Sequence, residues 1–271
     1  MGVPRVLNYP GSKWSMVNWI IDHMPAHEVY LEPYFGSGAI FFNKEPAKIE
    51  TINDIDSRVV NLFKVIRAHP YELARLVAFT PFSREEYQAS YELSPDPLED
   101  ARRFLVRCWQ AIGAKTSDRT GWRSSISANS PNNTKQWAEI PDVILKVTNR
   151  LKNAQIENQD AVQLIQRYNR ENVLIYADPP YVRSTRTNRH YAYEMNEQAH
   201  MDLLEVLMDH QGPVLLSGYE NALYQKYLKN WHREERIVTA EAGSKKKECL
   251  WINRIAAEQA GQINLFEVGY W

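Results

Sequence analysis

Short apolar runs alternate with longer amphipathic stretches through the first and last parts of the chain. The runs predict strands and the stretches between them predict helices. The expected strands are 29–31, 49–52, 173–177 and 214–217, and the expected helices span 56–66, 160–168 and 197–209. A strand-helix alternation of this kind predicts a largely parallel sheet.

The middle of the chain breaks this rhythm. Residues 71–151 contain helical stretches, clearest at 98–111, and a polar section at 113–133 that we interpret as a mobile loop within an inserted lobe. Near the other end, 236–238 and 248–252 predict an antiparallel pair around a basic turn, Lys245-Lys246-Lys247.

Composition narrows the class of protein. The 271 residues can bury a sizeable core. The start of the chain has no basic-then-apolar signal pattern, and no apolar stretch approaches the ~20 residues that a membrane helix needs. The two cysteines, Cys108 and Cys249, lie far apart without metal-ligand spacing, which favours a reduced, cytoplasmic setting.

Charge is distributed unevenly along the chain. The formal net charge is only −1, but residues 101–152 hold ten basic and three acidic side chains. Arg183, Arg186 and Arg189 follow with no acid before Glu194. Such segregation is expected where a protein contacts phosphates, so the sequence favours a nucleic-acid partner.

The tetrapeptide Asp178-Pro179-Pro180-Tyr181 directly follows the apolar run 173–177. Two prolines fix φ and remove two N–H donors, so their carbonyls point outward without ladder partners. An acid, rigid carbonyls and an aromatic ring then lie together at the carboxyl end of a strand, where open α/β sheets bind ligands. This combination suits an exocyclic amine on a heterocycle.

A glycine pair follows an earlier strand. Phe35-Gly36-Ser37-Gly38 lies between the strand at 29–31 and an expected helix start, and lets the backbone approach a ligand. Asp54 ends the next strand, at the place of a ribose-binding carboxylate. A third glycine is absent, which favours a ligand without a pyrophosphate and disfavours a nicotinamide dehydrogenase.

Two further candidates have plainer alternatives. Tyr9-Pro10-Gly11-Ser12-Lys13 is either a surface turn or a place where Lys13 meets a carboxylate while aromatic rings cover an adenine. Asp160 is either an ordinary helix N-cap or a contact for the adenine amino group of a cofactor.

Taken in order, the lysine motif, the glycine motif, the insertion and the tetrapeptide resemble S-adenosylmethionine-dependent amino-methyltransferases. The resemblance is closest to the alpha group of DNA adenine-N6 methyltransferases, the Dam-like family, and covers nearly the whole chain. It implies a Rossmann-like α/β catalytic sheet formed by 1–68 and 152–271. It also implies an inserted, mainly helical target recognition domain at 69–151.

The resemblance also implies roles for individual residues. Asp178 and the Pro179 carbonyl would accept the hydrogens of adenine N6, and Tyr181 would stack on the flipped base; no metal is expected. Tyr34 stands where the family often has a smaller residue, which affects the shape of the methionine pocket. The catalytic set is Asp178, Pro179, Pro180 and Tyr181, and the S-adenosyl-L-methionine set is Tyr9, Pro10, Lys13, Glu32, Phe35, Gly36, Gly38, Asp54 and Asp160.

The implied partner is double-stranded DNA. The expected contacts are Arg119, Trp122, Arg123, Ser124, Arg183, Arg186 and Arg189. Trp122 either wedges into the duplex or packs within the lobe, and Arg183, Arg186 and Arg189 either contact phosphates or form a flexible basic loop.

The last residues and the cellular role carry further expectations. Gln262, Leu265 and Phe266 resemble a peptide that docks on the bacterial sliding clamp, the alternative being a tail packed on its own domain. We expect a monomer in the cytoplasm, at a bacterial nucleoid or in a phage-infected host, acting alone or in restriction-modification. An RNA or other amino-group methyltransferase, or an inactive DNA-binding homologue, remains the alternative.

Overall fold

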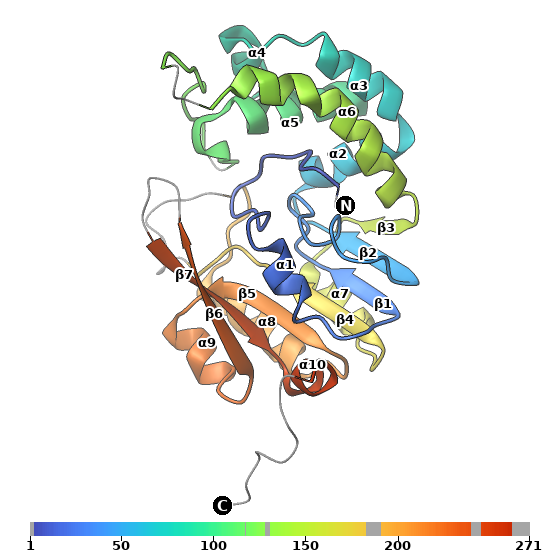
Figure 1. Cartoon of the computed structure of the whole chain (residues 1–271), viewed down its shortest axis with the longest axis vertical. Helices are drawn as coiled ribbons and strands as arrows, with labels where there is room; N and C mark the ends of the chain where they lie inside the picture. Colours follow the sequence, from blue (N-terminus) through green and yellow to red (C-terminus); the bar gives the residue numbers. More distant parts are fainter. Residues whose placement is uncertain (1–2, 117, 128–130, 183–190, 240–244, 262–271) are drawn as a thin grey trace, which may run out of the picture.

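A seven-stranded sheet forms the centre of the computed structural model, which describes residues 3–116, 118–127, 131–182, 191–239 and 245–261 (Figure 1). The spatial order is β3-β2-β1-β4-β5-β7-β6. The first five strands run parallel, and β7 is antiparallel to both of its neighbours. The predicted fold class is thereby confirmed. The strands are β1 (Val29–Glu32), β2 (Ile49–Asn53), β3 (Ala154–Glu157), β4 (Val173–Ala177), β5 (Val214–Tyr219), β6 (His232–Thr239) and β7 (Lys245–Ile252).

Both faces of the sheet are covered. Along β4, Leu174 and Tyr176 join one hydrophobic cluster, while Ile175 joins the other. The first face packs against α1 (Val17–Ile21) and α10 (Arg254–Gln259), and the second against α7 (Ala161–Arg167), α8 (Glu197–Met208) and α9 (Ala222–Tyr227). Strands buried on both faces read as continuous apolar runs, which is why β4 was visible in the sequence.

The insertion forms a helical lobe beyond one end of the sheet (Figure 1). Helix α3 packs on α6, and α2 packs on α5. One hydrophobic cluster runs without interruption from Phe104 and Ile144 in the lobe to Leu174 in the sheet, so lobe and sheet share a core. Helix α2 (Ser57–Ala68) precedes the insertion and packs against it; the helices of the insertion are α3 (Pro70–Ala78), α4 (Arg84–Ala89), α5 (Pro97–Gln110), the 3₁₀ turn η1 (Ile112–Ala114) and α6 (Asn133–Leu151).

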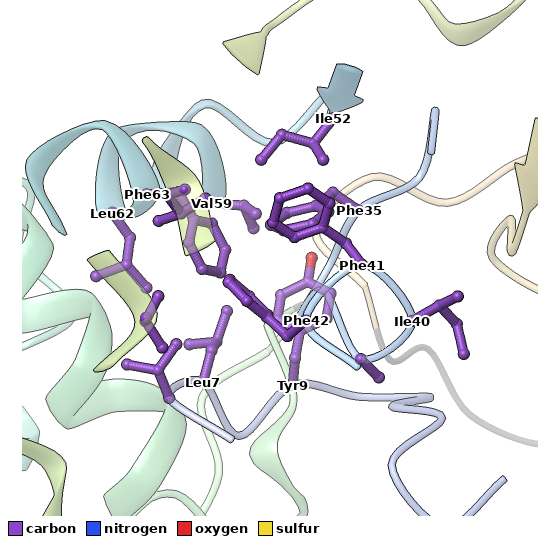
Figure 2. Close-up of a cluster of buried hydrophobic side chains, with 14 of the residues drawn as sticks. Leu7, Tyr9, Phe35, Ile40, Phe41, Phe42, Ile52, Val59, Leu62 and Phe63 are labelled. Atoms are coloured by element: carbon purple, nitrogen blue, oxygen red, sulfur yellow. The ribbon is translucent and has the colours of Figure 1, made fainter. Parts of the chain in front are cut away.

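The structure corrects two local expectations. The segment after Gly38 forms a short run of consecutive turns instead of a helix, and Phe41 and Phe42 both enter a ring cluster with Phe35 and Phe63 (Figure 2). The basic run at 245–247 lies inside β7, because its backbone continues the ladder to β6.

Over the described ranges, no helix combines the length and the apolar character that crossing a membrane requires.

Candidate active site

Four acidic residues line the carboxyl edge of the parallel strands. Asp160 follows β3, Asp54 follows β2, Glu32 ends β1 and Asp178 follows β4. Since these strands are neighbours in this order, the carboxylates form a row, and all four line one cavity of about 720 Å³. That volume is typical of a site for a small molecule or cofactor. Because β1 pairs with β2 on one side and β4 on the other, the cavity lies where the direction of strand addition reverses.

The glycine turn after β1 is tied to Asp54. Gly36 adopts φ +49° and donates its N–H to Asp54 Oδ2 at 2.8 Å. Asp54 Oδ1 accepts the N–H of Asp56 at 2.9 Å. Burial raises the pKa of Asp54 to about 7, although these backbone donors oppose the rise. The turn and the carboxylate therefore form one preorganised unit against the cavity wall.

Gly38 belongs to the same turn and makes room for a neighbouring aromatic ring. It does not line the cavity; it has φ +67°, and a Cβ there would lie 2.4 Å from the ring of Phe35. Phe35 and Tyr34 both line the cavity, so the bulky Tyr34 does shape the pocket. The glycine allows the aromatic cluster of Figure 2 to close under the cavity floor.

Glu32 is buried at the centre of the row. Its Oε2 accepts the hydroxyl hydrogen of Tyr30 at 2.7 Å. Burial, together with the negative charge of Asp178, raises the pKa of Glu32 to about 8. Glu32 thus offers an acceptor whose charge is readily neutralised near physiological pH.

Asp178 pairs with the lysine of the N-terminal motif. Lys13 is 3% exposed, which rules out a surface turn, and its Nζ lies 2.8 Å from Asp178 Oδ2 and donates to the Gly11 carbonyl at 2.8 Å. Asp178 Oδ1 is buried and has no hydrogen-bond partner within the described part of the chain. Burial raises the pKa of Asp178 and Lys13 opposes that rise. The carboxylate thus keeps one oxygen open at the rim of the cavity.

Tyr181 follows this carboxylate in the chain and packs against strands β5 and β7 through Tyr219 and Glu248. Lys13 Nζ is 4.8 Å from the centre of its ring, and its hydroxyl donates to Glu248 Oε2 at 2.6 Å. Pro180 lines the cavity, whereas Pro179 and Tyr181 do not. The sequence interpretation missed Glu248. A signal existed, because Glu248 alternates in phase with Leu250 and Ile252, which are buried in one face of β7.

Two more elements close the cavity. Tyr9 and Tyr191 both line it, with ring centres 6.0 Å apart, and a Cβ on Gly11 would lie 2.0 Å from the Tyr191 hydroxyl oxygen. Pro10 lines the cavity in the same segment. Tyr191 carries no local sequence motif and was missed. Asp160 caps α7 by accepting from Gln163 N at 3.0 Å, and it also lines the cavity. Its contact with the adenine amino group of a cofactor stays a prediction.

The lobe residues expected at DNA are arranged differently. Trp122 packs within the lobe: its Nε1 donates to Gln110 Oε1 at 3.1 Å, and its ring centre lies 5.7 Å from that of Phe82. Arg119 is exposed, with its guanidinium 4.9 Å from the ring centre of Tyr91. Arg123 is half-buried and Ser124 is exposed. Arg183, Arg186 and Arg189 fall outside the described residues.

Several lobe cations are neutralised internally. Arg102 contacts Glu86 and Glu99 at 2.7 Å, and Arg103 also contacts Glu99 at 2.7 Å. Arg150 pairs with Glu50 of β2. The acids in these pairs precede residue 101, so counting charge over 101–152 overstated the excess available to a partner.

The site fits S-adenosylmethionine. The cavity has the volume of a cofactor site, four carboxylates on its walls can accept hydrogen bonds from hydroxyl and amino groups, and aromatic rings line it as well. The sheet order, with its antiparallel end and its pocket at the carboxyl edge, is that of the methyltransferase fold.

Similarity to known proteins shows which family of methyltransferases the chain belongs to. Residues 9–245 match the sequence profile of the D12 class N6 adenine-specific DNA methyltransferases, and the chain belongs to this family. The family uses S-adenosylmethionine as methyl donor. The DNA adenine methylases of Salmonella typhi and Escherichia coli K12 are 26% and 25% identical over 259 residues, which cover 89% of this chain and 91% of theirs.

Two other similarities are more distant. The type II methyltransferase M1.LlaDCHI of Lactococcus lactis subsp. cremoris is 22% identical over 264 residues, 88% of each chain. A solved structure of a putative RNA methyltransferase from Pyrococcus horikoshii superposes with a TM-score of 0.39 and 10% identity, covering 93% of this chain and 90% of that one.

Proposed function

We propose that the row of carboxylates divides into a cofactor half and a base half. In the cofactor half, Asp54 accepts from the ribose hydroxyls, Glu32 and the turn at Gly36 hold the methionine part, and Asp160 meets the adenine end. Their order along β1, β2 and β3 supports this division, because it gives an elongated ligand consecutive acceptors. The bound cofactor supplies an electrophilic methyl group on a sulfonium.

In the base half, Asp178 and the Pro179 carbonyl accept the two hydrogens of an extruded adenine N6. The open Asp178 Oδ1 is the single observation that carries this proposal, because a buried acceptor without a partner costs free energy until a donor reaches it. With both hydrogens held, the N6 lone pair faces the methyl group. Positioning supplies much of the rate acceleration, and the acceptors stabilise positive charge that develops on N6.

Lys13 keeps Asp178 in its ionised state. Burial alone would favour a protonated Asp178, which would donate where the adenine amino group needs an acceptor. The ammonium at 2.8 Å offsets this cost. Lys13 in this role acts on the base half and not on the methionine carboxylate.

The proposed substrate is an adenine within duplex DNA. In a duplex N6 is paired and stacked, so the base must be flipped out, at a cost of a few kcal/mol. Arg119, Arg123 and Ser124 would contact the backbone beside the target, and Trp122 would support their loop from within. We expect the protein to act as a monomer in the cytoplasm, at a bacterial nucleoid or in a phage-infected host. Docking of Gln262, Leu265 and Phe266 on a sliding clamp stays a prediction, since these residues lie outside the described ranges.

Substituting Asp178 tests the base half. We expect Asp178→Ala to lower kcat for transfer of a tritiated methyl group to duplex DNA by at least ~100-fold, comparable to removing a transition-state hydrogen-bond acceptor. Cofactor affinity measured by calorimetry should change less than about threefold, because Asp54 and Glu32 remain.

The exposed Asp22, the C-cap residue that follows α1, provides a matched control: Asp22→Ala should match the unmodified protein in both measurements. Full activity of Asp178→Ala would refute the assignment. Nucleoside digestion with mass spectrometry checks the product, and RNA as acceptor in a parallel reaction tests the competing substrate.

A further inference from the structure

The hydroxyl of Tyr181 lies near two carboxylates that come from distant parts of the chain. It donates to Glu248 Oε2 at 2.6 Å, and Glu248, in β7, is 6% exposed. Asp178, three residues before Tyr181, also interacts with this tyrosine, which lowers the pKa of Asp178. One buried phenol therefore interacts with both the proposed catalytic carboxylate and a second one.

One hydroxyl carries one hydrogen, so it satisfies only one of these carboxylates at a time. Burial and the two negative charges raise the pKa of Tyr181 well above 10, so the phenol keeps its hydrogen at physiological pH. The hydrogen is directed to Glu248, and Asp178 Oδ1 has no partner among the described residues. Without Glu248, the same hydrogen would turn towards Asp178.

The sheet fixes this arrangement. Glu248 of β7 stands directly opposite Tyr219 of β5 in the antiparallel ladder. The ring of Tyr219 meets that of Tyr181 at 4.5 Å between centres, with planes 70° apart. Two directly paired residues thus hold Tyr181, one by its hydroxyl and one by its ring, and paired strands are among the most rigid supports that a site can have.

We propose that Glu248 is a positioning residue for methyl transfer: it holds the Tyr181 hydroxyl hydrogen away from Asp178 and fixes the ring on which the target base stacks. Asp178 is thereby left free to accept from adenine N6. The inference rests on the role proposed above for Asp178 and on the expectation that the flipped base stacks on Tyr181. Glu248 acts through Tyr181 and does not touch the base.

A double-substitution cycle tests this dependence. We expect Glu248→Ala to lower kcat about 10- to 100-fold, the range for a lost hydrogen bond to a charged group, with cofactor affinity within about twofold. Glu248→Gln retains an acceptor oxygen and should keep at least about a third of kcat. In a Tyr181→Phe background, Glu248→Ala should change kcat less than about threefold, because no hydroxyl is left to misdirect.

A second measurement follows the base itself. With 2-aminopurine at the target position, Glu248→Ala should reduce the fluorescence change on binding, since the stacking ring is less well held. Glu234→Ala, on the neighbouring strand β6 and in contact with His232, is the matched control and should leave both readouts unchanged.

The outcomes separate the two proposals. Wild-type kcat in Glu248→Ala, equal losses in Glu248→Ala and Glu248→Gln, or effects of Glu248 and Tyr181 that simply multiply would overturn the positioning role. Absence of 6-methyladenine from the reaction of the unmodified protein would instead overturn the proposed function. Should Glu248→Ala fail to bind cofactor because it is misfolded, the cycle with Glu248→Gln and Tyr181→Phe decides: a Gln variant with less than a tenth of kcat overturns the proposal.

Discussion

The cavity at the sheet edge and the helical lobe both bury charged side chains, but they treat them differently. In the lobe, Arg102 is held by Glu86 and Glu99, and this pairing lowers the pKa of Glu99 to about 2. At the sheet edge, burial raises the pKa of Glu32 to about 8 and that of Asp54 to about 7. Buried charges that are paired with opposite charges stabilise a fold, whereas buried carboxylates whose pKa lies near physiological pH are typical of a functional site.

The largest expected effect comes from removing the ion pairs of Arg102 in the lobe. Arg102→Ala should lower the free energy of unfolding by about 3 kcal/mol, because it leaves the Glu86 carboxylate without its cation and removes a donor from Thr80 and from Glu99, which keeps only Arg103. Denaturant titration measures this. Arg103→Ala is the matched control: it shares Glu99 but is more exposed, and should cost less than about 1 kcal/mol. Equal losses in the two variants would contradict the distinction.

A smaller effect on stability is expected from the raised pKa of Glu32 at the sheet edge. The pKa of Glu32 is about 8 in the folded state against an ordinary value of 4.5, so the folded protein binds the proton more tightly. Its contribution therefore makes stability fall as pH rises from about 4.5 to about 8. Glu32→Gln cannot ionise and should be more stable than the unmodified protein at pH 8.5 by at least ~1 kcal/mol, with little difference near pH 4.5.

Unfolding titrations at several pH values test this prediction. Part of the slope should survive in Glu32→Gln, because the pKa of Asp54 is also raised, to about 7. Glu28→Gln, just before β1 and exposed, provides the control and should reproduce the unmodified curve. Identical pH dependence in Glu32→Gln and the unmodified protein would show that Glu32 ionises normally.

The smallest effect concerns the exposed cations of the lobe. Arg119→Ala should weaken DNA binding only a few-fold and reduce the slope of log K against log salt by roughly one, as expected for one lost phosphate contact. Fluorescence anisotropy across a salt series measures the slope. Arg254→Ala, an exposed arginine on α10, should leave it unchanged. An unaltered slope in Arg119→Ala would remove this residue from the interface.

The sequence allowed the sheet edge to be predicted in some detail. Asp54 and Asp178 each follow an apolar run, so strand direction alone brings them to one edge. The pairings of Arg102 with Glu86 and of Arg150 with Glu50 of β2 could not be predicted in this way, because these residues meet only through tertiary packing. The same holds for Glu248, which reaches Tyr181 only after β7 is placed beside β5.

The segment after Gly38 shows why local patterns fail. Its apolar residues were compatible with a helix, but Phe41 and Phe42 are both drawn into one aromatic cluster and the backbone follows them. Tertiary packing overrides local preference at such points.

The uninterrupted cluster from Phe104 through Ile144 to Leu174 constrains how new DNA specificity can arise on this scaffold. Replacing the whole insertion with that of a relative would pair lobe side chains from one protein with sheet side chains from another, and their volumes would not match in the shared core. Substitutions confined to exposed loop positions around Arg119 and Ser124 leave the packing of that core unchanged. New DNA specificity therefore arises with fewer changes there, in evolution or in protein engineering.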